Sequence, residues 1–171
     1  MVDKKNIINL VDKVINKCGT RNPYKIAKQL GIDIIYVGFK KQKGVYKIIK
    51  RNRFIFLSTN LDEIMQKIVL FHEIGHDLLH RDVASKIGIF QEFNLFNYRS
   101  SRMEYEANMF AAEISLPTDA IMEYIELGYT SEQIATNMQT DINLVALKLD
   151  ILREQGYKLN RQDYSNKFLK G

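Results

Sequence analysis

Cysteine is nearly absent from this sequence, and so are tryptophan, proline and long hydrophobic runs. The 171 residues include one cysteine, Cys18, two prolines and no tryptophan. A single cysteine excludes the intramolecular disulfide framework that supports many small secreted domains. No run approaches the roughly 18 apolar residues of a membrane-spanning helix, and the first residues lack the apolar core of a signal peptide. These absences predict a soluble cytoplasmic protein with no membrane partner.

Histidine is also scarce, and its distribution is informative. The three histidines of the chain all lie between positions 72 and 80, and residues 72–76 read HEIGH. The pattern H-E-x-x-H on a helix is typical of zinc hydrolases. Apolar residues recur at helical spacing from Leu61 onward, and Asn60 followed by Glu63 matches a capping box. We therefore expect the motif to lie on a long, partly buried helix.

Helix geometry explains why this chemistry needs this spacing. At about 100° and 1.5 Å per residue, His72 and His76 share one face and lie roughly 6 Å apart along the axis. Both rings can then bind one metal ion. Glu73 flanks the pair, where a carboxylate can act as the general base for a metal-activated water. His80 lies about 12 Å along the axis from His72, so we expect it to support the site and not to bind the same ion.

The third metal ligand has to come from elsewhere, because catalytic zinc usually has three protein ligands and a water. The segment 104–113 is the obvious source, since it offers Glu104, Glu106 and Glu113 on one predicted helix. Glu106 and Glu113 flank the apolar stripe of this helix on one side and Glu104 flanks it on the other. Periodicity alone leaves Glu106 and Glu113 nearly tied. Small residues at Ala107 and Gly75 favour close packing of the two helices.

Two segments resemble the ImmA/IrrE family of metallopeptidases. They are HEIGHDLLH at 72–80 and EANMFAAEISLP at 106–117, and residues 22–32 are similar to the N-terminal region of that family. The resemblance covers roughly residues 20–155. It implies a gluzincin-like zinc endopeptidase with one Zn²⁺ per chain, and it favours Glu106 as the third ligand. It also implies a protein substrate, a DNA-binding helix-turn-helix repressor whose cleavage releases phage, mobile-element or stress genes.

The rest of the chain predicts an α+β fold of the zincin type with an all-α C-terminal part. Three short strands are expected at 32–37, 45–49 and 54–57, and the last of them could pair with substrate if it lay at a sheet edge. Residues 81–99 lack clear periodicity and predict a loop or broken helix. Pro117 ends the helix that starts near Ser101. The predicted units are a metallopeptidase domain (1–117), a helix-turn-helix-like subdomain (118–155) and a basic tail (156–171).

The distribution of charge bears on whether the C-terminal helices bind nucleic acid, whereas an intact Glu73 favours an enzyme over a binding protein. Residues 1–60 carry a net charge of +11, whereas residues 118–155 carry −5. Direct nucleic-acid binding by the acidic helices is therefore disfavoured, because phosphate contacts supply most DNA affinity. The alternative to a peptidase is a helix-turn-helix regulator, or a toxin–antitoxin-associated binding protein, with a non-catalytic metal site. The oxyanion-stabilising residue could be Tyr98, Tyr105 or His80, and nothing in the sequence predicts an oligomeric state.

Overall fold

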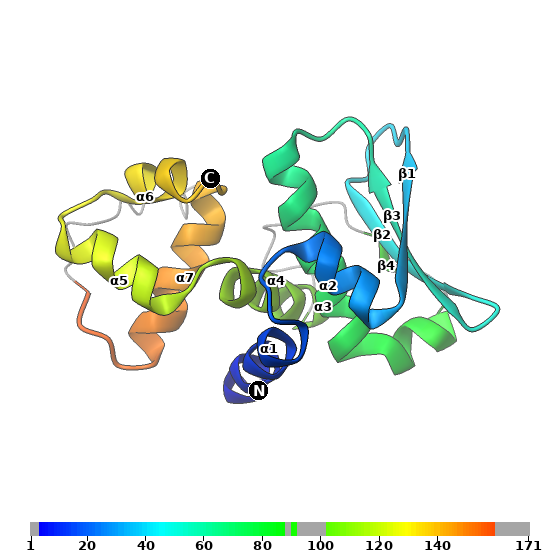
Figure 1. Cartoon of the computed structure of the whole chain (residues 1–171), viewed down its shortest axis with the longest axis horizontal. Coiled ribbons are helices and arrows are strands. Elements are labelled where there is room, and N and C mark those ends of the chain that lie inside the picture. Colours follow the sequence, from blue (N-terminus) through cyan, green and yellow to red (C-terminus); the bar gives the residue numbers. More distant parts are fainter. Residues whose placement is uncertain (1–3, 88–89, 92–101, 160–171) are drawn as a thin grey trace.

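The computed structural model describes residues 4–87, 90–91 and 102–159 of the chain. Within these ranges a small sheet lies at one end of the molecule with helices packed beside it (Figure 1), which confirms the α+β class. The helices are α1 (Lys4–Cys18), α2 (Pro23–Leu30), α3 (Glu63–Ile87), α4 (Arg102–Ser115), α5 (Thr118–Glu126), α6 (Ser131–Asn137) and α7 (Ile142–Glu154). The strands are β1 (Ile32–Val37), β2 (Gly44–Ile49), β3 (Asn52–Ser58) and β4 (Phe90–Gln91).

The sheet has the order β1-β3-β2-β4. β1 runs parallel to β3, whereas β2 is antiparallel to both β3 and β4. The three predicted strands are present, and β4 adds a fourth within the segment that predicted a loop or broken helix. β3 pairs on both sides, so the expectation that it could offer a free edge to substrate is wrong. Residues 92–99, including Tyr98, lie outside the described residues.

Local signals explain where α2 and α3 begin. Asn22 caps α2 by accepting a hydrogen bond from the backbone of Lys25, and Pro23 occupies the first helical position, as predicted. The predicted cap of α3 is wrong by two residues, because Asp62 accepts from the Met65 N–H at 2.8 Å. The Asn60 side chain instead donates to the carbonyl of Phe39.

α3 packs on one face of the sheet and extends further than predicted, to Ile87. Its backbone leaves helical geometry at His80 (φ −129°, ψ 17°), where the helix is kinked. α4 crosses α3 closely, because a side chain on Gly75 would meet the Ala107 Cα at 3.2 Å. The predicted close approach of these two helices is therefore present.

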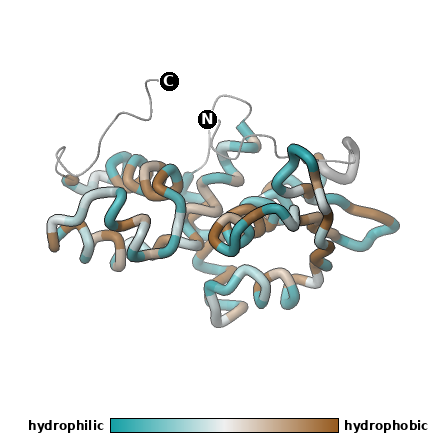
Figure 2. Tube along the Cα trace, turned by 90° about the horizontal axis from the view of Figure 1, so that it is seen from above, coloured by the Kyte–Doolittle hydropathy of each residue, from teal (hydrophilic) through white to brown (hydrophobic). Residues whose placement is uncertain are grey.

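α4 is the central helix of the molecule. It contacts α3 on one side and α1 and α7 on others, and every residue from Ala107 to Ile114 is buried. In Figure 1, α5, α6 and α7 lie on the opposite side of α4 from the sheet. Figure 2 shows teal and brown alternating along these helices, as expected for amphipathic segments. Among the described residues, no helix has the length and apolar character needed to cross a bilayer.

Candidate metal centre

The middle of α3 places the three side chains of the predicted motif in the interior. His72, Glu73 and His76 are all at most 1% exposed. The Nε2 atoms of His72 and His76 lie 3.0 Å apart, with the two rings nearly perpendicular at 81°. One helix therefore aims both imidazoles at a common point, as the four-residue spacing predicts.

Glu104 of α4 completes this group. Its Oε2 lies 3.3 Å from His72 Nε2, and its Oε1 lies 3.5 Å from His76 Nε2. Four ligands arranged tetrahedrally around zinc, with bonds of about 2.0–2.2 Å, stand roughly 3.3 Å from one another. The observed separations therefore fit the requirements of a zinc ion. The structure brings His72, His76 and Glu104 together as the candidate metal ligands among the described residues.

Glu106 and Glu113 point elsewhere. The Glu106 carboxylate lies 3.0 Å from His80 Nε2 and 2.7 Å from Arg102 Nε, and not at the histidine pair. Glu113 accepts from Lys148 Nζ at 2.6 Å in a buried ion pair. The reason is the rotation of α4 on α3, since two residues along a helix differ by about 200°. The packing of α4 turns the flank with Glu104 towards the two histidines. Glu104 therefore approaches them, and Glu106, which the resemblance favours as the third ligand, does not.

Asn108 is a residue of this centre that the sequence reasoning missed. Its side-chain carbonyl accepts from His72 Nδ1 at 2.8 Å. His72 therefore carries its proton on Nδ1, and the lone pair of its Nε2 faces Glu104 and His76. This is the tautomer in which Nε2 can bind a metal. A signal was available, because Asn108 follows Glu104 by four residues and so lies on the same face of α4.

The state of the second ring also suits metal binding. Burial lowers the pKa of His76 to about 4, the dominant cause being desolvation. The ring is therefore neutral near neutral pH, and neutral imidazole is the form that coordinates a metal. Burial also lowers the pKa of His80, whose Nδ1 lies 3.1 Å from His76 Nδ1.

Glu73 lies against β2 at a position that tolerates no side chain. A Cβ on Gly44 would stand 2.8 Å from Glu73 Oε1 and 2.5 Å from Val69 Cγ1. Gly44 therefore lets the strand approach the predicted general base closely. From the sequence alone Gly44 is only a turn residue before a strand, because its partner on α3 is far away in the sequence.

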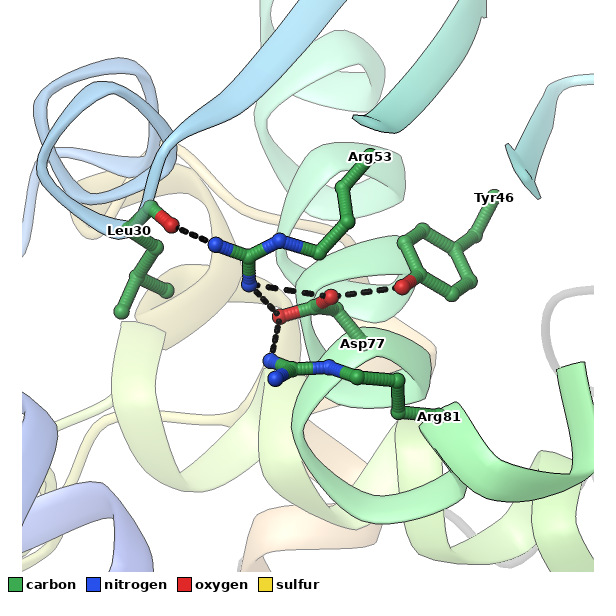
Figure 3. A network of polar contacts seen from close by, with 5 residues as sticks. All are labelled: Leu30, Tyr46, Arg53, Asp77 and Arg81. Atoms are coloured by element: carbon green, nitrogen blue, oxygen red, sulfur yellow. Dashed lines mark hydrogen bonds and ion pairs between the residues drawn. The ribbon is translucent and has the colours of Figure 1, made fainter. Parts of the chain in front are cut away.

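A network of polar contacts centred on the buried Asp77, one residue after His76, attaches α3 to the sheet (Figure 3). Asp77 accepts from Tyr46 at 2.6 Å, from Arg53 at 2.9 Å and from Arg81 at 2.8 Å. Arg53 also donates to the carbonyl of Leu30 at the end of α2. Burial raises the pKa of Tyr46, and its hydrogen bond to Asp77 adds to this effect. The network fixes the helix that carries two of the candidate metal ligands.

The described candidates for stabilising an oxyanion have other contacts. Tyr105 lies beneath the ammonium group of Lys4, which is 5.6 Å from the ring centre. His80 lies between His76 and Glu106. Neither contact singles out an oxyanion donor, so this role stays a prediction for both residues.

The chain is similar to known proteins over most of its length. Residues 27–150 match the family profile of the M78 peptidases, described as the IrrE N-terminal-like domain. The chain is 32% identical over 139 residues to uncharacterized immunity region protein 2 of Bacillus phage phi105, covering 81% of this chain and 85% of that protein. It is 29% identical over 134 residues to metallopeptidase ImmA of Bacillus subtilis, covering 77% and 76% of the two chains.

Proposed function

Because this chain belongs to the ImmA/IrrE family of metallopeptidases, we propose that it is a zinc-dependent endopeptidase with one Zn²⁺ per chain. The ligands in this proposal are His72, His76 and Glu104. The observation that carries it is the convergence of three ligand atoms from α3 and α4 at separations suited to zinc. The metal, when bound, supplies a Lewis acid that lowers the pKa of a water molecule and polarises the scissile carbonyl.

Glu73 is the general base in this proposal. Its carboxylate is fully buried, and it follows His72 directly on α3, so it flanks the metal ligands without joining them. It takes the proton of the attacking water and passes it to the leaving amine. The buried Asp77 network holds α3 in place during this exchange.

The proposed substrate is a DNA-binding helix-turn-helix repressor, cut at one site so that phage, mobile-element or stress genes are expressed. The support is the similarity to a phage protein named for an immunity region and to a metallopeptidase named ImmA. A repressor acts in the cytoplasm, so the proposed site of action is cytoplasmic.

In this proposal the zincin-like metallopeptidase domain spans 1–117, and the helices of 118–155 form a helix-turn-helix-like subdomain that recognises protein. The segment 118–155 has two cationic side chains, Lys148 and Arg153. Lys148 is 1% exposed and pairs with Glu113, and Arg153 pairs with Asp150 at 2.7 Å. A DNA-binding helix needs cations directed at phosphates, so these contacts argue against DNA recognition by α7.

Glu73→Gln provides the test that separates an enzyme from a binding protein. The amide preserves the shape of the side chain but cannot accept the proton, so the variant should bind zinc and cleave nothing. Zinc content and cleavage of a purified repressor would be measured side by side. Cleavage at the wild-type rate by Glu73→Gln would contradict the proposed mechanism.

A further inference from the structure

A line of polar contacts leads away from the candidate metal ligands along α3 and onto α4. His76 Nδ1 lies 3.1 Å from His80 Nδ1. On the other side of its ring, His80 Nε2 lies 3.0 Å from Glu106 Oε2, and Glu106 Oε1 lies 2.7 Å from Arg102 Nε. The ring of His80 therefore bridges a candidate metal ligand and a carboxylate.

The positions of the protons follow from these contacts. His76 Nε2 faces His72 and Glu104 and needs its lone pair to bind a metal, so the proton of His76 belongs on Nδ1. That N–H donates to His80 Nδ1, which must then be the acceptor nitrogen of its ring. The proton of His80 consequently sits on Nε2 and is donated to Glu106. One assignment of protons therefore fits the contacts that run from His76 through His80 to Glu106.

The Nδ1 atoms of the two proposed histidine ligands contact different kinds of partner. His72 donates its outer N–H to the neutral amide of Asn108, whereas His76 donates towards an anionic carboxylate through His80. A hydrogen bond from a metal-binding histidine to a carboxylate orients the ring and makes its other nitrogen a stronger donor. Here the carboxylate acts through an intervening imidazole, and the Arg102 guanidinium holds that carboxylate in place.

We propose that His80 and Glu106 are positioning residues for His76, which together fix its tautomer and strengthen its Nε2 as a metal ligand. This inference rests on the metal centre proposed above, but not on peptidase activity. It gives Glu106 a role although its carboxylate lies away from the histidine pair. The kink of α3 at His80 and the flank of α4 that carries Glu106 bring the two residues together.

The test measures the affinity for Zn²⁺ by competition with a chelating dye. His80→Ala and Glu106→Gln should each weaken zinc binding about 10- to 100-fold, the usual effect of removing such a partner. The double variant should bind no more weakly than His80→Ala alone, because Glu106 acts only through His80. His80→Asn, which offers a side-chain oxygen near the position of Nδ1, should recover part of the loss.

A matched control separates this role from general loss of stability. Glu113→Gln changes another buried carboxylate on the same helix, one that contacts Lys148 and not the metal centre. It should leave zinc affinity unchanged. With Co²⁺ in place of zinc, the visible absorption bands should shift in His80→Ala and Glu106→Gln but not in Glu113→Gln, since only the first two change the hydrogen bonding of the ligand His76.

The outcomes distinguish this inference from the proposed function. If wild-type protein binds zinc and His80→Ala binds it within about twofold of wild type, where a loss of at least tenfold is expected, the positioning role is overturned. Independent, additive losses in His80→Ala and Glu106→Gln would overturn it as well. If the wild-type protein binds no zinc, the metal centre itself is wrong and this inference falls with it.

Discussion

Gly44 shows how much of this site depends on a single missing side chain. Gly44→Ala would place a methyl group 2.8 Å from Glu73 Oε1 and 2.5 Å from Val69 Cγ1, closer than real Cβ contacts allow. The strand or the base must shift, and a shift of about 1 Å in a catalytic group can reduce the rate about 100-fold. We expect the turnover of Gly44→Ala to fall by that order while zinc affinity stays near wild type.

Gly38→Ala is the matched control for this prediction. A Cβ at Gly38 would lie 3.9 Å from the Thr59 hydroxyl, which is an ordinary contact. Its turnover should therefore equal that of the wild type. Equal activity of Gly44→Ala and Gly38→Ala would show that the position of Glu73 does not depend on this close approach.

The carboxylates of α4 give a second prediction at the residue scale. Glu104→Ala removes an oxygen that lies 3.3 Å from His72 Nε2, so it should abolish tight zinc binding. Glu106→Ala should cause the smaller loss of about 10- to 100-fold expected for a residue behind a ligand. Metal content after dialysis would be compared for both variants. Retention of zinc by Glu104→Ala together with its loss from Glu106→Ala would restore the ligand set that the resemblance favours.

The two halves of the candidate site differ in how far the sequence predicts them. His72, Glu73 and His76 lie on one helix, so their spacing alone determines which side chains share a face. The third carboxylate is on another helix, and its identity depends on how α4 is rotated about its axis. Packing sets that rotation through contacts such as Gly75 against Ala107. The apolar pattern of one helix does not contain this information. Periodicity therefore favours Glu106 and Glu113 about equally, and not Glu104.

At the scale of elements, α4 is held at its C-terminal end by groups from two other parts of the chain. Lys148 of α7 donates to Glu113 at 2.6 Å, and Arg21 donates to the carbonyl of Ile114 at 2.6 Å. Burial lowers the pKa of Lys148, an effect that the nearby Glu113 carboxylate opposes. The two contacts link the helix that carries Glu104 to the C-terminal helices and to the segment before α2.

Removing one partner of the buried pair should therefore destabilise the protein. Lys148→Met leaves the Glu113 carboxylate buried without its cation, and breaking such a pair costs about 3–5 kcal/mol. The double variant Lys148→Met/Glu113→Leu should recover most of that loss, because no charge is left uncompensated. Urea unfolding of the metal-free protein would measure both values. A double variant as unstable as the single one would show that the pair contributes through packing and not through charge.

The elements themselves were predicted more accurately than their arrangement. Strands β1 to β3 and helix α2 follow local signals such as alternating apolar residues, Asn22-Pro23 and the αL residue Gly31. The strand order does not follow from such local signals. β1 pairs with β3, although β2 lies between them in the sequence. Nothing local in residues 54–57 shows that this strand is paired on both sides. The continuation of α3 beyond His80 was also missed, since the sequence there has no helical periodicity.

At the scale of the whole molecule, charge is divided between regions that lie on different sides of α4. Residues 34–61, which include β2 and β3, contain no acidic side chain and seven cationic ones. The segment 118–155 has a net charge of −5. Complementary surface charge selects partners and accelerates their association more than it raises affinity. None of these charged side chains is among the candidate metal ligands, so they can contribute to substrate choice without taking part in the reaction.

The last prediction is that cleavage is limited to a specific regulator. An untargeted peptidase would damage the cell. We expect specificity to come from docking outside the metal centre, through surfaces such as the basic segment 34–61. We expect the protein to cut the repressor encoded beside its gene at one position and to leave casein intact under the same conditions.

Glu73→Gln and a chelator serve as the two inactive controls. Efficient digestion of casein, with no preference for the repressor, would show that the site itself accepts any unfolded chain and that docking does not determine the substrate.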